Sequence, residues 1–200
     1  MTVAREPANQ TKQPEKLRTI TTRPARWAAS SLAVASRFGK CECVQLLLEA
    51  GASVLGIDNF DPYYDVSLKE ARNARLEAHE RFTVDRIGIE DMSAFEGVWR
   101  DFAPDVAIHL AAQAGVRYSI DNPRAYVRAN LAGHLNILEL ARARKVGHLV
   151  YASSSSVYGA RAKQPSSLGD RVDHPISLYA ATKKADELMS ETYAHLYRIP

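Results

Sequence analysis

Short apolar segments alternate with helical segments along most of this chain, and this alternation limits the folds it can adopt. Strands that are apolar throughout and joined by helices are typical of a parallel sheet with both faces covered. The sequence therefore predicts an α/β fold with a doubly wound parallel sheet. The predicted strands are 31–35, 53–57, 82–87, 105–109 and 148–152, and the predicted helices are 41–50, 67–80, 92–102, 123–144 and 178–196.

The amino-terminal segment differs in composition from the rest of the chain. Residues 1–26 are polar, basic and without periodicity, which predicts a disordered, solvated tail. This basic segment has no interleaved aromatic residues, so a nucleic-acid-binding arm is not favoured. The remaining 27–200 form one predicted domain, because a 200-residue chain that is 46% hydrophobic suffices for one sizeable core.

Composition also limits the environment and the cofactors that we expect. No run of about 18 apolar residues is present, so the sequence predicts no membrane span. Cys41 and Cys43 are too close for a framework disulfide and too few for a zinc site. The histidines show no metal-ligand spacing. We therefore expect a cytoplasmic protein that uses no metal.

Polar and small residues follow several of the predicted strands, at the point where each strand ends. Asp58 closes one strand, Leu110–Gln113 follows another, and the serine run Ser153–Ser156 follows the last. The carboxyl ends of parallel strands meet at one edge, where such sheets bind their ligands. The sequence therefore predicts a single binding site that collects these three groups.

A tyrosine and a lysine in the last predicted helix have the spacing of a proton-transfer pair. Tyr179 and Lys183 are four residues apart and share one helix face. Free tyrosine has a pKa of about 10 and is a poor base at neutral pH. A neighbouring ammonium favours the phenolate. With a hydroxyl from the serine run Ser153–Ser156, the pair predicts removal of a proton from an alcohol.

Asp58 has two interpretations. A carboxylate at the end of the second strand can accept hydrogen bonds from an adenosine ribose, and it would repel a 2′-phosphate. This interpretation predicts NAD rather than NADP. Alternatively, Asp58 begins an Asx turn in the segment Asp58-Asn-Phe-Asp-Pro62.

These motifs together resemble the extended short-chain dehydrogenases/reductases, in the group of NAD-dependent nucleotide-sugar epimerases and dehydratases. The resemblance covers roughly 44–200 and is most similar to UDP-glucuronate 4-epimerases. Its motifs are Gly56-Ile-Asp-Asn-Phe60, Asp58 to Lys69, His109-Leu-Ala-Ala-Gln113, Gln113-Ala-Gly-Val-Arg-Tyr-Ser119, Asn122-Pro to Asn130, Ser153-Ser-Ser-Ser-Val-Tyr-Gly159 and Tyr179-Ala-Ala-Thr-Lys183.

The resemblance implies a Rossmann-like fold and a role for each matched residue. Ser154 would be the catalytic hydroxyl, with Ser155 and Ser156 as alternatives, and Tyr179 the base. Lys183 would also bind the nicotinamide ribose. Arg117 would face a glucuronate carboxylate, or else be a solvated surface arginine. The implied NAD-binding residues are Asp58, Asn59, Leu110, Ala111, Ala112, Gln113, Asn130, Tyr179 and Lys183.

The sequence departs from the family pattern at three places. The three glycines of the family's cofactor loop fall on Val34, Arg37 and Lys40, which suggests a reading-frame slip or a mis-assigned start upstream of residue 44. Gly88 stands where many relatives place an aspartate that faces adenine, so that contact is expected to pass to backbone or to be lost. Relatives also continue well beyond Pro200, so we expect a fragment that lacks the substrate-binding lobe.

The resemblance implies an NAD-dependent epimerase that acts on a UDP-sugar through a 4-keto intermediate. UDP-glucuronate is the first candidate substrate, and UDP-glucose or UDP-galactose the alternative. A 4,6-dehydratase is disfavoured because Ser155 and Ser156 stand where that reaction needs carboxyl groups. A non-catalytic remnant, or a binding partner of an intact paralogue, remains an alternative from a different class. A homodimer through the helices near 123–144 and 178–196 is also expected.

Overall fold

A five-stranded parallel sheet forms the centre of the molecule. The computed structural model describes residues 31–35, 41–160 and 165–200. The strand order is β3-β2-β1-β4-β5, and each neighbouring pair is parallel. This order confirms the predicted doubly wound, Rossmann-like sheet, with its switch point between β1 and β4. The strands are β1 (Ser31–Ala35), β2 (Ser53–Ile57), β3 (Phe82–Asp85), β4 (Val106–His109) and β5 (His148–Tyr151).

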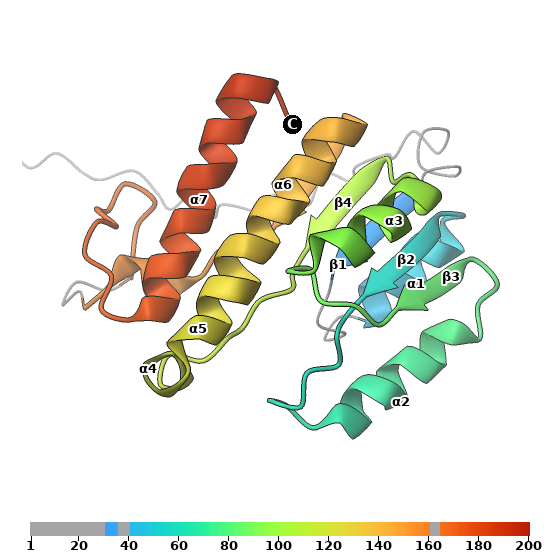
Figure 1. Cartoon of the computed structure of the whole chain (residues 1–200), viewed down its shortest axis with the longest axis horizontal. Helices are drawn as coiled ribbons and strands as arrows, with labels where there is room; N and C mark the ends of the chain where they lie inside the picture. The colour runs from blue at the N-terminus through green and yellow to red at the C-terminus, as the bar shows by residue number, and fades with distance from the viewer. Residues whose placement is uncertain (1–30, 36–40, 161–164) are drawn as a thin grey trace, which may run out of the picture.

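Helices cover both faces of the sheet (Figure 1). One hydrophobic cluster joins α1 and α2 to the sheet through Leu48, Val54 and Leu76. The other joins α3 and α6 through Leu55, Trp99 and other buried residues. Successive β2 residues therefore serve opposite cores, as parallel strands covered on both faces require. The α-helices that flank the sheet are α1 (Cys41–Glu49), α2 (Val66–Glu77), α3 (Met92–Phe102), α6 (Gly133–Arg144) and α7 (Leu178–Tyr197).

Side-chain caps fix where three of these helices begin. Asp65 accepts a hydrogen bond from the backbone N–H of Ser67 at 2.9 Å, and Asp91 accepts one from Ala94 at 3.1 Å. Ser177 does the same for Ala180 at 3.0 Å. Each cap satisfies one of the backbone donors left free at a helix start. The cap at Ser177 fixes the turn of α7 that carries Tyr179.

The region predicted as one helix over 123–144 is divided in the structure. It consists of α5 (Pro123–Tyr126), the π-helical segment η1 (Val127–Ala132) and then α6. Two short elements were not predicted, α4 (Tyr118–Asp121) and the 3₁₀ helix η2 (Ser155–Tyr158). Each is four residues long, and periodicity over so few residues gives no helical signal.

Several sequence predictions concern residues that the structure does not describe. The tail 1–26 lies outside the described residues, as do Arg37 and Lys40 of the segment that replaces the glycine loop. Val34 lies in β1, opposite Gly56 of β2 and Ile108 of β4.

The structure also bears on membrane and metal binding. Within the described ranges, no helix has the length and apolar character needed to cross a membrane. The same part of the chain contains no group of three or more His, Cys, Asp or Glu side chains that could hold a metal ion. Neither Cys41 nor Cys43 is part of a disulfide; the first is buried and the second exposed.

Candidate active site

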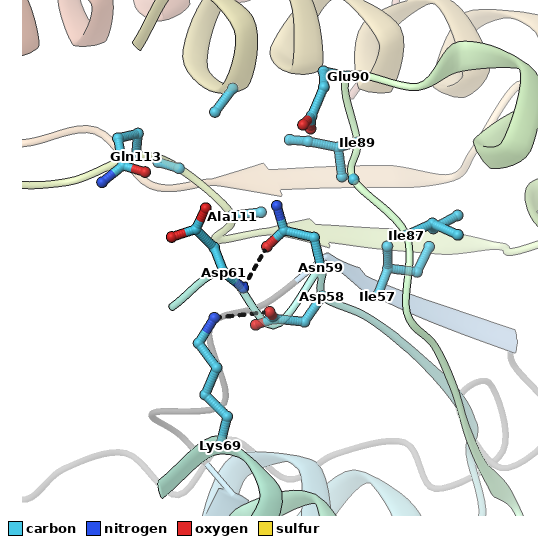
Figure 2. A pocket seen from close by; sticks show the side chains of 13 residues that line it. Ile57, Asp58, Asn59, Asp61, Lys69, Ile87, Ile89, Glu90, Ala111 and Gln113 are labelled. Atoms are coloured by element: carbon cyan, nitrogen blue, oxygen red, sulfur yellow. Dashed lines mark hydrogen bonds and ion pairs between the residues drawn. The ribbon is translucent and has the colours of Figure 1, made fainter. Parts of the chain in front are cut away.

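Two adjoining pockets lie at the carboxyl edge of the sheet. The first, here the Asp58 pocket, lies beyond β2, β3 and β4 (Figure 2). The second, here the Tyr179 pocket, lies between the segment after β4 and the start of α7. Ala111 and Ala112 line both, so the pockets meet across the strand-end segment. Two pockets that share part of their lining fit a ligand with two ends, such as a dinucleotide.

The predicted site residues divide between these pockets. Asp58, Asn59 and Gln113 line the Asp58 pocket. Leu110, Tyr179 and Lys183 line the Tyr179 pocket. The parallel sheet therefore brings together segments that are more than a hundred residues apart, as the strand-end pattern predicts.

The structure confirms the Asx-turn interpretation of Asp58, and its contact with a ribose stays a prediction. Its Oδ1 accepts a 2.6 Å hydrogen bond from the backbone N–H of Phe60, which is the Asx turn. The same oxygen accepts a 3.0 Å hydrogen bond from Lys69 Nζ on α2. The turn thus holds the carboxylate at the pocket wall, where it remains able to accept a hydrogen bond from a ribose hydroxyl.

Gly88 adjoins a carboxylate that was not predicted. A Cβ placed on Gly88 would lie 2.6–2.8 Å from the carboxylate atoms of Glu90. Glu90 lines the Asp58 pocket and its side chain points into it (Figure 2). In this chain the space beside Gly88 therefore contains the Glu90 carboxylate, where the sequence predicted a backbone contact or none.

Asn130 fastens the strand-end segment to α7. Its Oδ1 accepts from the backbone N–H of Gln113 at 2.7 Å, and its Nδ2 donates to the Gln113 carbonyl at 3.1 Å. Nδ2 also donates to Thr182 Oγ1 at 3.0 Å. Asn130 is 1% exposed and is not part of the lining of either pocket. Its contact with NAD stays a prediction. Through these hydrogen bonds Asn130 acts as a clamp, which links the backbone of Gln113 to Thr182 of α7.

Tyr179 and Lys183 lie on one face of the first turns of α7. The ring of Tyr179 packs edge-on against Tyr126, with centroids 6.0 Å apart. Tyr126 is fully buried and donates a 2.8 Å hydrogen bond to the carbonyl of Ala114. Lys183 is buried and forms an ion pair with Asp186, 2.7 Å from Nζ to Oδ2. Each side chain is thus held by contacts that leave it at the pocket.

Three side chains near Lys183 have pKa values far from their ordinary ones. Burial raises the pKa of Asp186 to about 6, although the charge of Lys183 opposes that rise. Burial and Lys183 lower the pKa of His134 to about 4. Burial, His134 and Lys183 hold the pKa of His109 well below its usual range. Both imidazoles are therefore neutral at physiological pH, and neither is placed to act as a cationic acid.

The serine run lies near the pocket but does not single out one hydroxyl. Ser153 lines the Tyr179 pocket, and its Oγ donates to Glu187 at 2.5 Å. Ser154 begins η2, where its Oγ accepts from the N–H of Ser156 at 3.2 Å and from its hydroxyl at 2.9 Å. The assignment of the catalytic hydroxyl to Ser154, with Ser155 and Ser156 as alternatives, stays a prediction.

Arg117 lies apart from both pockets. It is exposed at the amino-terminal end of α4 and does not belong to the lining of either pocket. A solvated arginine and a substrate contact both remain possible assignments for it.

Besides Glu90, Lys69 and Asp186 are charged residues at the site that were not singled out from the sequence. Lys69 forms an ion pair with Asp58, and Asp186 forms one with Lys183. Lys69 shares a buried stripe of α2 with Asn73 and Leu76. The helical spacing of 69, 73 and 76, which places Lys69 on the same face as Leu76, is the signal that could have indicated a buried Lys69.

Most of the chain matches a known protein family. The family model described as GDP-mannose 4,6 dehydratase matches residues 41–200. The chain belongs to this family. The match confirms the predicted membership of the NAD-dependent epimerase and dehydratase group.

The relatives of this family member include named 4-epimerases. A probable UDP-glucuronate 4-epimerase of Rhizobium meliloti is 52% identical over 154 residues, which are 77% of this chain and 45% of the relative. The chain thus spans about half the length of the curated relatives it matches.

Solved structures of epimerases share the fold. The UDP-glucuronic acid 4-epimerase of Bacillus cereus, in complex with UDP-glucuronic acid and NAD, has a TM-score of 0.76 and 29% identity. It covers 85% of this chain, which matches 54% of that structure. The UDP-glucose 4-epimerase of Thermotoga maritima, with UDP-glucose, has a TM-score of 0.72, 26% identity, and coverage of 84% and 52%.

Proposed function

We propose that this chain is the cofactor-binding and catalytic part of an NAD-dependent UDP-sugar 4-epimerase, with UDP-glucuronate as substrate. The observation that carries the proposal is the position of Tyr179 and Lys183 in a pocket that adjoins the Asp58 pocket. One end of the paired site has a proton-transfer group, and the other has a carboxylate suited to a ribose. Relatives named UDP-glucuronate 4-epimerase support this substrate.

The residues present fit a dinucleotide. Asp58 supplies an acceptor for ribose hydroxyls, and Asn59 lies beside it. Ala111 and Ala112, which have small side chains, line both pockets. Lys183 would donate to the second ribose. When bound, NAD would take a hydride from sugar C4 and return it.

The proton steps belong to the chain's own residues. Tyr179, as phenolate, would take the proton from the 4-hydroxyl while the C4 hydrogen leaves with its electron pair. The sugar becomes a 4-ketone. After the ketone turns, hydrogen returns to C4 on the opposite face and Tyr179 gives the proton back to O4. Lys183 favours the phenolate by its charge, and a hydroxyl of the serine run would hold O4.

Incubation of the 200-residue chain with NAD and UDP-glucuronate tests the proposal. We expect UDP-galacturonate to form, measured by chromatography of the nucleotide sugars. Tyr179→Phe should lower turnover by about 10²- to 10⁴-fold, the usual contribution of a general base. A chain that binds NAD but converts no UDP-sugar would instead support the non-catalytic alternative, as a remnant or as the partner of an intact paralogue.

UDP-glucose is the second candidate substrate, because a UDP-glucose 4-epimerase shares this fold. The two substrates differ at sugar C5, where glucuronate has a carboxylate. Faster turnover of UDP-glucose than of UDP-glucuronate in the same assay would favour the second candidate. Arg117→Ala tests the predicted carboxylate contact, since it should slow only the UDP-glucuronate reaction.

Two further sequence predictions belong to this proposal. A homodimer through α5, α6 and α7 stays a prediction. So does a reducing compartment such as the cytoplasm.

A further inference from the structure

The Asp58–Lys69 ion pair lies where it contributes little as a stabilising contact. The two side chains are 6% and 9% exposed, and Lys69 Nζ lies 3.0 Å from Asp58 Oδ1. Removing two charges from water costs about as much as their attraction returns. The pair therefore adds little to the free energy of unfolding. Its role lies in the hydrogen-bonding groups and the charge that it places at the Asp58 pocket.

The pair leaves specific hydrogen-bonding groups unused. Asp58 Oδ1 accepts from both Phe60 and Lys69, whereas Oδ2 accepts no hydrogen bond from any described residue. A lysine ammonium has three donors. Within the described chain, one donor of Lys69 is used, by Asp58. The pair therefore offers one fixed carboxylate oxygen together with free ammonium donors at the pocket wall (Figure 2).

Lys69 also determines the charge of the pocket. Asp58, Asp61 and Glu90 are acidic lining residues, and Lys69 is the one cation among the described residues that line it. Arg86 contributes from nearby, but two hydrogen bonds of 2.6 Å commit its guanidinium to Glu70 at the surface. Removing Lys69 would leave the described lining with negative charges alone.

We propose that Lys69 is a cofactor-specificity residue, which orients Asp58 for a ribose diol and sets how strongly the pocket rejects a 2′-phosphate. The inference rests on the dinucleotide site of the proposed function. Lys69 positions the carboxylate by occupying Oδ1, so that Oδ2 is the oxygen left to accept from the ribose. Its positive charge offsets part of the repulsion that the three carboxylates exert on a phosphate.

Equilibrium binding of NAD and NADP to the whole chain tests this assignment, with calorimetry as the readout. Lys69→Met should weaken NAD binding and weaken NADP binding further. Loss of a unit charge a few ångströms from a phosphate should raise the preference for NAD over NADP by about tenfold or more. Arg72→Met is the matched control, since it removes an exposed cation from the same helix and should leave the preference unchanged.

The outcomes separate a specificity role from a structural one. Equal weakening of both dinucleotides, or a preference that shifts toward NADP, would overturn the inference. If Lys69→Met does not fold, Lys69→Gln keeps a hydrogen-bond donor for Asp58 without the charge and should shift the preference in the same direction. A folded parent that binds neither dinucleotide overturns the inference as well. Binding with the expected preference but without epimerisation would contradict only the catalytic part of the proposed function.

Discussion

Lys183 lies among buried ionisable groups from three elements of the fold. Asp186 pairs with it on α7, His134 approaches from α6, and His109 lies at the end of β4. The rings of His109 and His134 are 5.1 Å apart. Because the two imidazoles are held neutral, the charge near Tyr179 depends mainly on Lys183 and Asp186. Protonation of Asp186 changes that charge within the range of pH at which enzymes are usually assayed.

The raised pKa of Asp186 makes a prediction about stability. Since its folded-state pKa of about 6 exceeds the ordinary 3.8, the folded protein holds this proton more tightly than the unfolded chain. The free energy of unfolding should therefore contain a contribution that is full below pH 4 and is lost as pH rises through 6. Its size is at most about 3 kcal/mol. His134, with a lowered pKa, contributes the opposite slope.

Urea unfolding of the parent and of Asp186→Asn at several pH values isolates the Asp186 contribution. Asp186→Asn has no carboxyl proton to lose. Its free energy of unfolding relative to that of the parent should therefore increase between pH 4 and pH 7. Glu191→Gln, which changes an exposed carboxylate on the same helix, is the control. Parallel pH profiles for the parent and Asp186→Asn would contradict the prediction.

The π-helical segment η1 explains how one helix side chain can hold two other elements. Asn130 lies in η1 and bonds both polar groups of the Gln113 backbone and the Thr182 hydroxyl. A π-bulge inserts a residue into a helix and often marks a functional site. The segment that separates the Asp58 and Tyr179 pockets is therefore fixed from α7 through a single buried amide.

Asn130→Ala should destabilise the fold by about 3 kcal/mol, because it leaves buried donors and acceptors without partners. Asn136→Ala is a matched control on α6. Asn136 is half-buried and donates one hydrogen bond, to the carbonyl of Ile89 at 2.9 Å. Its loss should cost about 1 kcal/mol. Chemical denaturation measures both changes, and equal costs for the two variants would count against the clamp.

The elements show what the sequence could predict. The five strands follow from apolar runs, and the structure confirms them together with the predicted start of α7, which Ser177 caps. The division of 123–144 could not be predicted, because one inserted residue barely changes the hydrophobic period. Lys69 and Asp186 were missed for a different reason. Each is buried in an ion pair, Lys69 with Asp58 after β2 and Asp186 with Lys183 one turn away, whereas charge alone suggests an exposed side chain.

At the scale of the whole molecule, the two long helices α6 and α7 carry exposed apolar side chains. Leu135 of α6 is 40% exposed, and Leu188 and Leu196 of α7 are 59% and 60% exposed. Figure 1 shows α6 and α7 side by side. Exposed apolar groups on adjacent helices support the predicted homodimer.

Sedimentation velocity of the parent should therefore show a dimer. Leu188→Glu should shift it to monomer, because a charge would be buried in the predicted contact. Leu168→Glu is the control, since Leu168 is 98% exposed and lies in the loop before α7. A parent that is monomeric at every concentration, or a Leu188→Glu variant that stays dimeric, would contradict the prediction.

The transfer of hydrogen at sugar C4 tests the central claim most directly. UDP-glucuronate with deuterium at C4 would be incubated with the chain and NAD in ordinary water, and the products analysed by NMR and mass spectrometry. The account predicts UDP-galacturonate that keeps deuterium at C4, because the same hydrogen leaves and returns within one site. Product that carries solvent hydrogen at C4, or no product from a chain with bound NAD, would contradict it.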